Sequence, residues 1–505
     1  MSSLFRTKDI DQLVADSEDP SRRLAKRLGP WSLAALGVGA VIGSGIFVLT
    51  GTAAAGEVRS FESIFHAPVI DLLFNGFDPA SKVGRPGAGP GIALSFLLVA
   101  FACSFAALCY AELASMIPIA GSAYTYAYAT LGEIVAWIIG WDLILEYAVS
   151  NMAVAVGFSA YFNDALNVLF GVTLPKSLSE PAVVGGVLTG SLFNLPAFLI
   201  VMALTALLVR GVKESASANN AMVIVKIVAI LIFVFGAAGA VKSENWHPFM
   251  PNGFSGVMTG AAIVFFTYIG FDSVSTAAEE CRTPQRDLPF GIILSLVICT
   301  LLYVSVALTL TGIADWKSLN NAAPVANALK TLGYDGVRRW VDFGALVGMI
   351  SSLLVFQYGQ ARVWFAMSRD RLLPDAFSRV HPRFQTPHLS TWVAGFAVGI
   401  PAGVWDIGTF ADLSNIGTLF AFIIVSAGVI MLRRRDPSRK RGFRVPLVPV
   451  LPVISIVLCL ALMTSLPLET WIRFVVWLVI GLGIYFFYGR PRVAEGSANR
   501  THQRF

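Results

Sequence analysis

The chain has 505 residues, of which 56% are hydrophobic and 13% are charged, and its formal net charge is +6. With a mean hydropathy of +0.70, it is too apolar for a water-soluble protein, which must cover its surface with polar and charged residues. We therefore expect an integral membrane protein whose surroundings are the lipid bilayer.

Residues 1–30 are polar and form the N-terminal segment, without the apolar core that a cleavable signal peptide needs. After them, apolar stretches of roughly 20 residues recur, each long enough to cross a hydrocarbon core of about 30 Å as a helix. The third stretch is long enough to be bent or broken. Twelve spans are predicted, at 31–55, 91–117, 124–163, 194–212, 217–240, 255–278, 290–312, 340–367, 389–405, 409–432, 446–467 and 470–488.

The distribution of Lys and Arg predicts the topology. With the N-terminus in the cytoplasm, the basic groups at 22–27, 369–383 and 433–444 all lie on the inner side. This pattern is expected for a protein of the bacterial inner membrane whose two ends are cytoplasmic, including the tail 489–505. The positive charge then reflects topology, and nucleic acid is not predicted as a partner. The connection 57–89 becomes an outside loop with one short surface helix.

The first span contains GVGAVIGSGIFVLTG at 37–51, with Gly43-Ser44-Gly45 at its centre. Glycine and serine are weak helix formers, and broken backbone inside a bilayer is tolerated only where it lines a cavity or meets a ligand. Close packing against another helix accounts well for the two earlier glycines of this stretch. For Gly43-Ser44-Gly45 we favour a break in the helix.

Two ionisable residues lie deep in later spans, where such residues are candidates for function. Glu146 falls mid-membrane in the third span, and it either faces substrate or water or is a buried structural acid. Lys226 lies within AMVIVKIVAI of the fifth span, far from both ends. It either extends its ammonium to the membrane surface or carries a proton, because burial disfavours the charged form of lysine.

The sixth span has a matching interruption, FFTYIGFDSVS at 265–275. Paired glycine-interrupted segments in two five-helix halves are typical of inverted repeats with a substrate site at the bilayer midplane. The predicted repeats occupy 31–240 and 255–432, and 446–488 supplies two further helices. Asp272 follows the interruption, and it either pairs with a cation such as Lys226, senses protons, or caps or packs against the next half-helix.

The two predicted breaks expose complementary backbone groups. Unwinding at 43–45 frees N–H groups at the start of a half-helix, where the helix dipole favours an anion, and Ser44 can add a hydroxyl donor. A carboxylate fits this end. Carbonyls freed at the ends of the preceding half-helices attract a cation such as an ammonium. These carbonyls belong to Val41, Phe266 and Ile269, and the two charges together predict an amino acid as the small-molecule substrate.

Four segments in order resemble the amino acid-polyamine-organocation superfamily, and specifically bacterial members of its cationic amino acid transporter family. They are GVGAVIGSGIFVLTG, YAELASMIPIAGSAYTYAYATLG, FFTYIGFDSVSTAAEECRTPQRDLP and GQARVWFAMSRDRLLP. The resemblance covers essentially the whole chain. It implies an all-α integral membrane protein of the LeuT-type fold, with two inverted five-helix repeats plus two extra helices. Bacterial members of the family need not prefer cationic substrates.

The resemblance also implies roles for individual residues in substrate binding. The carbonyls of Val41, Phe266 and Ile269 would hold the amine, and the Phe266 ring would form an aromatic gate. The carboxylate would be bound by Gly43, Ser44 and Gly45.

In proton coupling, the resemblance gives Lys226 the place that a sodium ion fills in sodium-coupled relatives. Its ammonium would then meet carbonyls near Gly39 and the hydroxyls of Ser351 or Ser352 on the eighth span. Asp272 is the second candidate for binding protons.

These features predict a secondary-active amino acid transporter that works by proton symport. The chain lacks the GxxxxGK[ST], G-x-S-x-G and HExxH motifs, so an enzyme or an ATP-driven pump is not expected, and neither a metal nor a cofactor is predicted. Exchange without proton movement and a transporter-like sensor remain open. The candidates for determining substrate selectivity are Phe271, Glu146 and residues 354–357. A carboxylate facing the pocket would favour Lys or Arg, but we favour neutral substrates.

Overall fold

The computed structural model describes residues 3–17, 28–57, 65, 67–74, 85–119, 121–184, 187–210, 215–321, 323–382, 384 and 386–492. The predicted basic group at 22–27 and most of the predicted tail, 493–505, lie outside the described residues.

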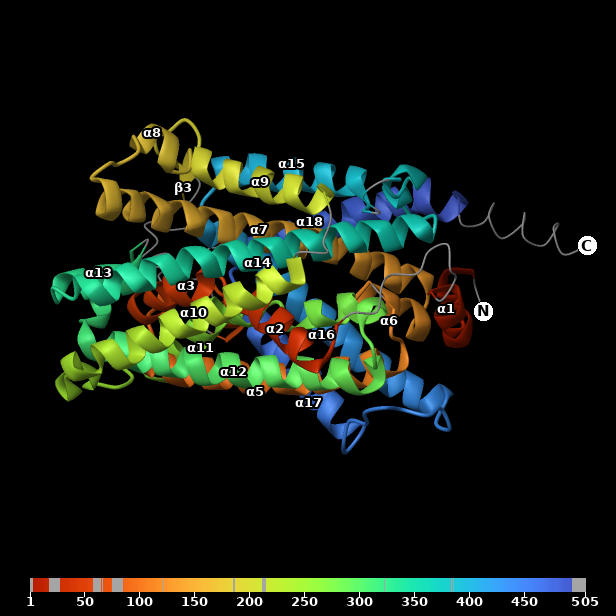
Figure 1. Ribbon diagram of the computed structural model, residues 1–505. Coiled ribbons are helices and arrows are strands. Elements are labelled where there is room, and N and C mark those ends of the chain that lie inside the picture. The colour runs from red at the N-terminus through yellow and green to blue at the C-terminus, as the bar shows by residue number, and fades with distance from the viewer. Residues whose placement is uncertain are drawn as a thin grey trace, which may run out of the picture.

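The chain folds into a bundle of helices, most of which run along one common direction (Figure 1). Within the described residues, eight helices are long and apolar enough to cross a membrane, or nine if the bent pair α2 and α3 is one span. Three shorter apolar helices bring the number to the twelve that the sequence predicts. The fold is therefore that of an all-α membrane protein. The helices of the twelve spans are α2 (Pro30–Val41) with α3 (Ser44–Ala55), α5 (Ile92–Met116), α7 (Glu133–Phe170), α9 (Leu195–Arg210), α10 (Ser215–Ala237), α11 (Gly253–Val264), α12 (Pro284–Ile313), α14 (Asp335–Arg369), α15 (His388–Val404), α16 (Ile407–Arg435), α17 (Val450–Thr464) and α18 (Leu468–Ile484).

Shorter elements connect the long helices. The bundle end that holds α1 is called the α1 end, and the opposite one, with α8 and α13, the α8 end (Figure 1). The described residues of the connection 57–89 include the short helix α4, in agreement with the short helix predicted there. The short elements are α1 (Ile10–Ser17), α4 (Val69–Phe74), α6 (Ala123–Thr130), α8 (Lys176–Ser179), α13 (Pro324–Thr331), the antiparallel strand pairs β1 (Gly56–Glu57) with β2 (Arg85–Pro86) and β3 (Val183–Val184) with β4 (Val187–Leu188), the 3-10 helices η1 (Ser3–Phe5), η3 (Gly89–Gly91), η4 (Ala238–Ala240), η5 (Ser243–Trp246), η6 (Phe265–Tyr268), η7 (Phe271–Glu280), η8 (Trp316–Ser318) and η9 (Asp375–Ser378), and the π-helical turn η10 (Tyr485–Gly489).

The third predicted span is broken, as its length indicated. The chain turns at Gly132, whose φ is +107°, so that α6 ends before α7 begins. A Cβ at this position would lie 2.7 Å from the backbone of Phe5, so glycine is required both by the conformation and by the space.

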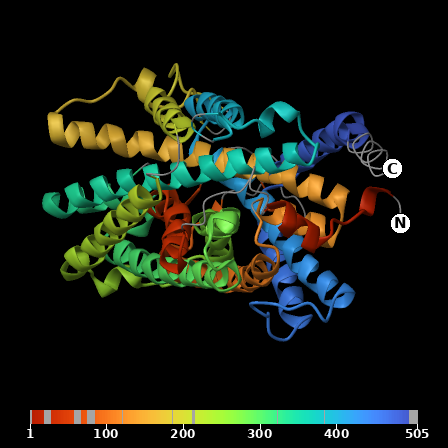
Figure 2. The ribbon, with the colours of Figure 1, turned by 45° about the vertical axis from the view of Figure 1, so that its right-hand side comes forward.

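Helices α7 and α14 form the centre of the bundle and lie side by side along its length (Figure 1 and Figure 2). In its most apolar stretch, 89% of α7 is buried, against only 22% of α18. Because a helix that is apolar all round must bury its surface in protein or in lipid, α7 is an interior helix and α18 faces the membrane. The division into two inverted repeats stays a prediction.

Candidate functional site

The first break lies between α2 and α3, which meet at an angle of 44°. Helix α2 ends at Val41 and α3 begins at Ser44, so that Ile42 and Gly43 form the break. The sequence placed the unwound residues at 43–45, and the structure shifts them toward the N-terminus. Ser44 and Gly45 are helical because the first turn of a helix tolerates residues that are weak in its interior.

The second break is in the sixth predicted span. Helix α11 ends at Val264 and continues as the 3-10 turn η6, and η7 begins at Phe271. Between them, Ile269 is extended and Gly270 has φ +121°, a conformation that L-residues with a side chain rarely adopt. The predicted interruption at 265–275 is confirmed.

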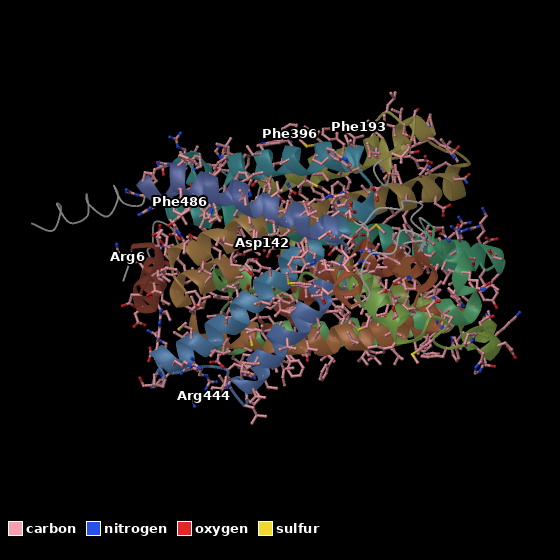
Figure 3. The ribbon with its side chains drawn as sticks, turned by 180° about the vertical axis from the view of Figure 1, so that it is seen from behind. Arg6, Asp142, Phe193, Phe396, Arg444 and Phe486 are labelled. Atoms are coloured by element: carbon pink, nitrogen blue, oxygen red, sulfur yellow. The ribbon has the colours of Figure 1, made fainter. Side chains whose placement is uncertain are left out.

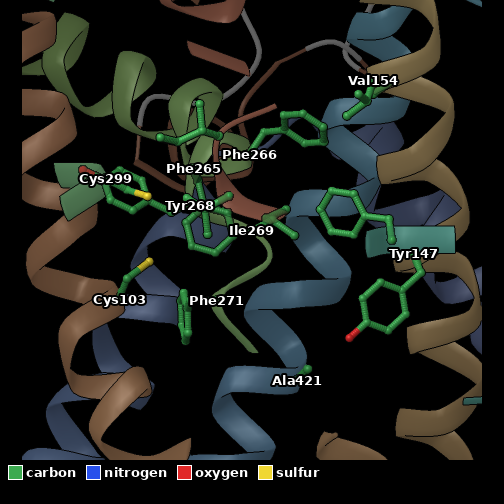
Figure 4. Packing of buried hydrophobic residues seen from close by; sticks show 14 of the residues in the cluster. Cys103, Tyr147, Val154, Phe265, Phe266, Tyr268, Ile269, Phe271, Cys299 and Ala421 are labelled. Carbon is green, nitrogen blue, oxygen red and sulfur yellow. The ribbon is translucent and has the colours of Figure 1, made fainter. Parts of the chain in front are cut away.

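The two breaks are packed directly against each other. A Cβ on Gly270 would lie 2.8 Å from Cβ of Ala40, and a Cβ on Gly45 would lie 2.7 Å from Cγ2 of Thr267. The glycines are therefore needed for close approach as well as for conformation. Figure 4 shows Phe266 and Ile269 of the second break, with the Phe266 ring directed toward Val154 of α7.

Tyr303 of α12 connects the two broken helices. Its hydroxyl oxygen lies 2.8 Å from the Val41 carbonyl and 2.8 Å from the Thr267 carbonyl, although its single proton can be donated to only one of them at a time. The Val41 carbonyl also accepts from the Gly43 N–H at 3.1 Å. A cation bound at Val41 would have to replace one of these donors. Sequence reasoning missed Tyr303, which lies far along the chain from Val41.

The start of α3 offers hydrogen-bond donors without acceptors. The hydroxyl of Ser44 is fully buried and has no hydrogen-bond partner in the described part of the chain. No side chain caps α3, and the first N–H groups of a helix have no partner within it. A Cβ on Gly43 would meet the Ser352 hydroxyl at 2.8 Å and a Val154 methyl group at 3.4 Å. This environment suits a small anion next to an apolar group.

Lys226 of α10 reaches the first break from the other side. Its side chain is fully buried, and its ammonium donates to the carbonyls of Gly39 at 2.7 Å and Ile42 at 2.9 Å. The Ile42 carbonyl is free to accept because the break removes its helical partner. The lysine thus links α10 to the point where the first helix bends.

The two serines predicted beside Lys226 have other partners. Ser351 donates to the side-chain oxygen of Asn219 at 2.8 Å, and Ser352 donates to the Ala40 carbonyl at 2.9 Å. Both hydroxyls lie near the first break, but no hydrogen bond joins either one to Lys226 among the described residues. Asn219 was not predicted.

Asp272 and Glu146 lie apart from Lys226. The Asp272 carboxylate, in the first turn of η7, accepts from the Tyr147 hydroxyl at 3.1 Å and from the Ser122 hydroxyl at 3.5 Å. Glu146 of α7 is buried, and neither of its oxygens has a hydrogen-bond partner in the residues described. The neighbouring hydroxyl of Thr418 donates instead to the Ser414 carbonyl at 3.1 Å.

The other residues proposed for selectivity are divided between two places. The Phe271 ring packs against Phe422 of α16, with ring centroids 5.0 Å apart, and against Tyr110 of α5 at 6.1 Å. On α14, within 354–357, the Phe356 ring lies 6.1 Å from the Tyr147 ring. Phe271 therefore contributes to an aromatic cluster, and Phe356 faces α7.

Polar contacts close the bundle at both ends of the site. Toward the α1 end, Arg362 of α14 donates to Glu280 of η7 at 2.6 Å. Toward the α8 end, Arg85 pairs with Asp412 of α16 at 3.0 Å, and both side chains are buried. The Phe266 ring is only 5% exposed.

Glu112 lies at the α1 end of α5 and has structural contacts. Its carboxylate accepts two hydrogen bonds from Arg433, each at 2.8 Å, and one from the Val445 N–H at 2.7 Å. Arg441 donates to it as well, at 3.1 Å. The acid holds the connection between α16 and α17 against α5.

Known proteins resemble this chain over most of its length. Residues 28–485 match the sequence model of the amino acid permease family. The methylthioribose transporter of Bacillus subtilis strain 168 is 46% identical over 490 residues, which are 97% of this chain and 98% of that protein. The branched-chain amino acid permease BcaP of the same strain is 47% identical with the same coverage. The vacuolar cationic amino acid transporter 4 of Arabidopsis thaliana is 35% identical, over 87% of this chain and 68% of that protein.

Proposed function

The chain belongs to the amino acid permease family of the amino acid-polyamine-organocation superfamily, and on that premise we propose that it carries neutral amino acids by proton symport. It is a multi-pass membrane transport protein and not an enzyme. The identity of the substrate, the coupling to protons and the location in a bacterial inner membrane, with the α1 end in the cytoplasm, belong to the proposal.

One observation carries the proposal for the carboxylate. The buried hydroxyl of Ser44 has no partner in the described residues, although a buried polar group without a hydrogen bond is costly. A bound carboxylate would supply the acceptor for this hydroxyl and for the free N–H groups at the start of α3. Gly43 and Gly45 would leave room for it to approach the backbone.

The ammonium of the substrate would lie at the carbonyls of Val41, Phe266 and Ile269. These groups come from both breaks, so a single amino acid would bridge α2 and η6. At Val41 it would take the place of the Tyr303 proton or of the Gly43 N–H. The Phe266 ring, directed toward Val154 in Figure 4, would cover the bound substrate as a gate.

A neutral side chain suits the groups nearest to Gly43. The atoms closest to a Cβ on Gly43 belong to Ser352, with its hydroxyl, and to Val154, with a methyl group, and neither carries a charge. Glu146, the acid that would select Lys or Arg, lies near two other acids, Asp272 and Asp142. The relative named a branched-chain amino acid permease supports the same preference.

Proton coupling would use Lys226. When protonated, its ammonium would hold one carbonyl in the last turn of α2 and one in the break itself, and so would fix the first bend relative to α10. A neutral amine would bind these carbonyls more weakly and free α2 to move. One proton would therefore bias a two-state element, which symport requires.

Methylthioribose is a second candidate substrate, because a relative with almost the same identity is named as its transporter. It is a sugar thioether with neither a carboxylate nor an ammonium, so it would leave the charges offered by the two breaks unused. Exchange without protons and a sensor that binds without transport are the mechanistic alternatives.

A thermal-shift series on the purified protein separates these candidates. Leucine, isoleucine, valine, alanine, lysine, arginine and methylthioribose are compared at equal concentrations, since a ligand that binds only the folded protein raises its Tm. We expect the branched amino acids to stabilise most. Stabilisation by methylthioribose alone would refute the proposal. Uptake of the best ligand into proteoliposomes, with and without an inward proton gradient, then distinguishes symport, exchange and sensing.

A further inference from the structure

Helix α7 carries a second buried acid, Asp142, one helical turn before Glu146. Its side chain is fully buried, and neither carboxylate oxygen has a hydrogen-bond partner in the part of the chain that the structure describes. Residues four apart lie on one face of a helix, with their Cβ atoms about 6 Å apart. Figure 3 shows Asp142 within the bundle, away from Arg6 and Arg444 at its surface.

Among the residues that the structure describes, no Lys, Arg or His forms an ion pair with Asp142. Gly417 of α16 packs against its carboxylate, since a Cβ on Gly417 would lie only 2.7 Å from Oδ1 of Asp142. From α18, Trp477 stacks on Trp141 with ring centroids 4.4 Å apart, and Arg473 pairs with Glu469 instead. An isolated ionised carboxylate in such a place is very unfavourable. The neutral acid is the form that this environment accepts.

The acids of this region act on one another across two elements. Both Asp142 and Asp272 lie close enough to Glu146 for their charges to affect it. Asp142 and Glu146 belong to α7, whereas Asp272 belongs to η7, part of the broken sixth helix. The hydroxyls of Tyr147 and Ser122 donate to Asp272, and those of Thr418 and Tyr110 lie near Glu146. No Lys, Arg or His within the described ranges forms an ion pair with any of the three acids.

We propose that Asp142 is a proton-binding residue of the transport cycle and forms a proton-sharing cluster with Glu146 and Asp272. The inference rests on the proposed symport and adds a second proton site, separate from Lys226 and closer to the α1 end than Glu146. While the cluster keeps its protons, η7 stays against α7 through the bond between Tyr147 and Asp272. Loss of protons to the cytoplasm leaves like charges on both sides of this contact, and their repulsion separates η7 from α7.

Asn at position 142 keeps the shape of the side chain but cannot release a proton. The full-length protein with Asp142→Asn is reconstituted into proteoliposomes, and two activities are measured with radiolabelled leucine. Exchange of internal for external leucine should stay within about twofold of the unsubstituted protein, because it needs no net proton transfer. Accumulation driven by an inward proton gradient should fall by about tenfold or more, and exchange should lose its dependence on internal pH.

Two further variants make the result specific. Asp142→Glu keeps an ionisable carboxyl group and should retain gradient-driven accumulation. Asp342→Asn removes a buried acid at the α8 end, beside Arg338, and should also retain it. Full accumulation by Asp142→Asn would overturn the inference, and so would loss of exchange together with accumulation, since that indicates a role in folding or binding. If the unsubstituted protein exchanges no leucine, the proposed function fails instead.

Discussion

The ammonium of Lys226 donates to the carbonyl of Ile42, 2.9 Å away, and Ile42 is one of the two residues at which the first helix bends. A second bond, to Gly39, holds the last turn of α2 before the bend. The only deeply buried lysine among the described residues therefore sits at the hinge of the first broken helix, where it bonds to the carbonyls of Gly39 and Ile42. The substrate carboxylate is proposed to use the hydroxyl and N–H groups that follow Ile42. Because the lysine and the substrate would use different groups, we predict that substrate affinity and proton coupling can be altered independently.

Substitution of Gly43 by valine should abolish substrate binding without unfolding the protein. A Cβ there would meet the hydroxyl of Ser352 at 2.8 Å and would occupy the space through which a carboxylate approaches α3. Because the obstructing atom is the end of a small side chain, we expect a stability loss of only about 1–3 kcal/mol. Gly239→Ala, where no atom lies within 4 Å, is the control. Unchanged affinity in a thermal-shift titration of Gly43→Val would show that the break serves packing alone.

Ser44→Ala should weaken substrate binding by about tenfold and leave the stability of the empty protein unchanged. The tenfold figure corresponds to one hydrogen bond to a charged group, about 1.5 kcal/mol. Stability should not fall, because this hydroxyl has no partner to lose in the described structure. The Kd from a titration tests the predicted loss of affinity, and the Tm without ligand tests the predicted stability. A lower Tm with an unchanged Kd would indicate that the hydroxyl serves the fold.

Phe266→Ala should release bound substrate faster, while some binding survives. The ring is 5% exposed and is directed toward Val154 (Figure 4), and as a gate it would exclude water from the polar contacts of the bound substrate. Washout of labelled substrate from detergent-solubilised protein measures the release rate. Phe422→Ala, which removes an aromatic contact of Phe271, should lower Tm with little change in release. If both variants release substrate at the same rate as the unsubstituted protein, Phe266 is not a gate.

Glu112→Gln should destabilise the protein by about 3 kcal/mol and leave substrate affinity unchanged. It leaves Arg433 and the buried Arg441 without their shared carboxylate, and removal of one partner of a buried ion pair typically costs about 3–5 kcal/mol. The control is Glu469→Gln, whose ion pair with Arg473 is partly exposed and contributes about 0–1 kcal/mol. Thermal unfolding of both variants measures this difference. Equal losses of stability would contradict the structural role of Glu112.

The sequence predicted the broken helices because their cause is local. Gly43 and Gly270 interrupt apolar stretches that would otherwise be continuous, and this remains visible without any knowledge of the neighbours. The break in the first helix moved by about one residue, because Ser44 and Gly45 are tolerated in the first turn of α3. Local patterns thus locate a break but leave its register open.

The contacts of the site could not be predicted in the same way. Tyr303 meets Val41 across 262 positions of the sequence, and nothing around either residue indicates the other. The hydrogen bond from Ser351 to Asn219 was not predicted either. Which side of α14 faces α10 depends on how the two helices pack, and the sequence around Ser351 does not show this. Asp142 did give a signal, since it forms a pair with Glu146 four residues apart in an apolar stretch, where two acids are expensive.

Lys226→Ala should lose accumulation driven by an inward proton gradient and keep part of its substrate binding. The variant removes both bonds that hold the first bend, whereas the groups proposed to bind the carboxylate, at Ser44, stay in place. Accumulation should fall by about tenfold or more if the lysine is the main proton carrier. Lys226→Arg separates charge from titration, because an arginine can hold the carbonyls but does not release its proton. We therefore expect it to bind substrate and fail to accumulate it. If both variants accumulate leucine under a proton gradient as the unsubstituted protein does, coupling does not run through Lys226, and the acids of α7 and η7 become the candidates. If the gradient drives no accumulation even in the unsubstituted protein, transport is exchange.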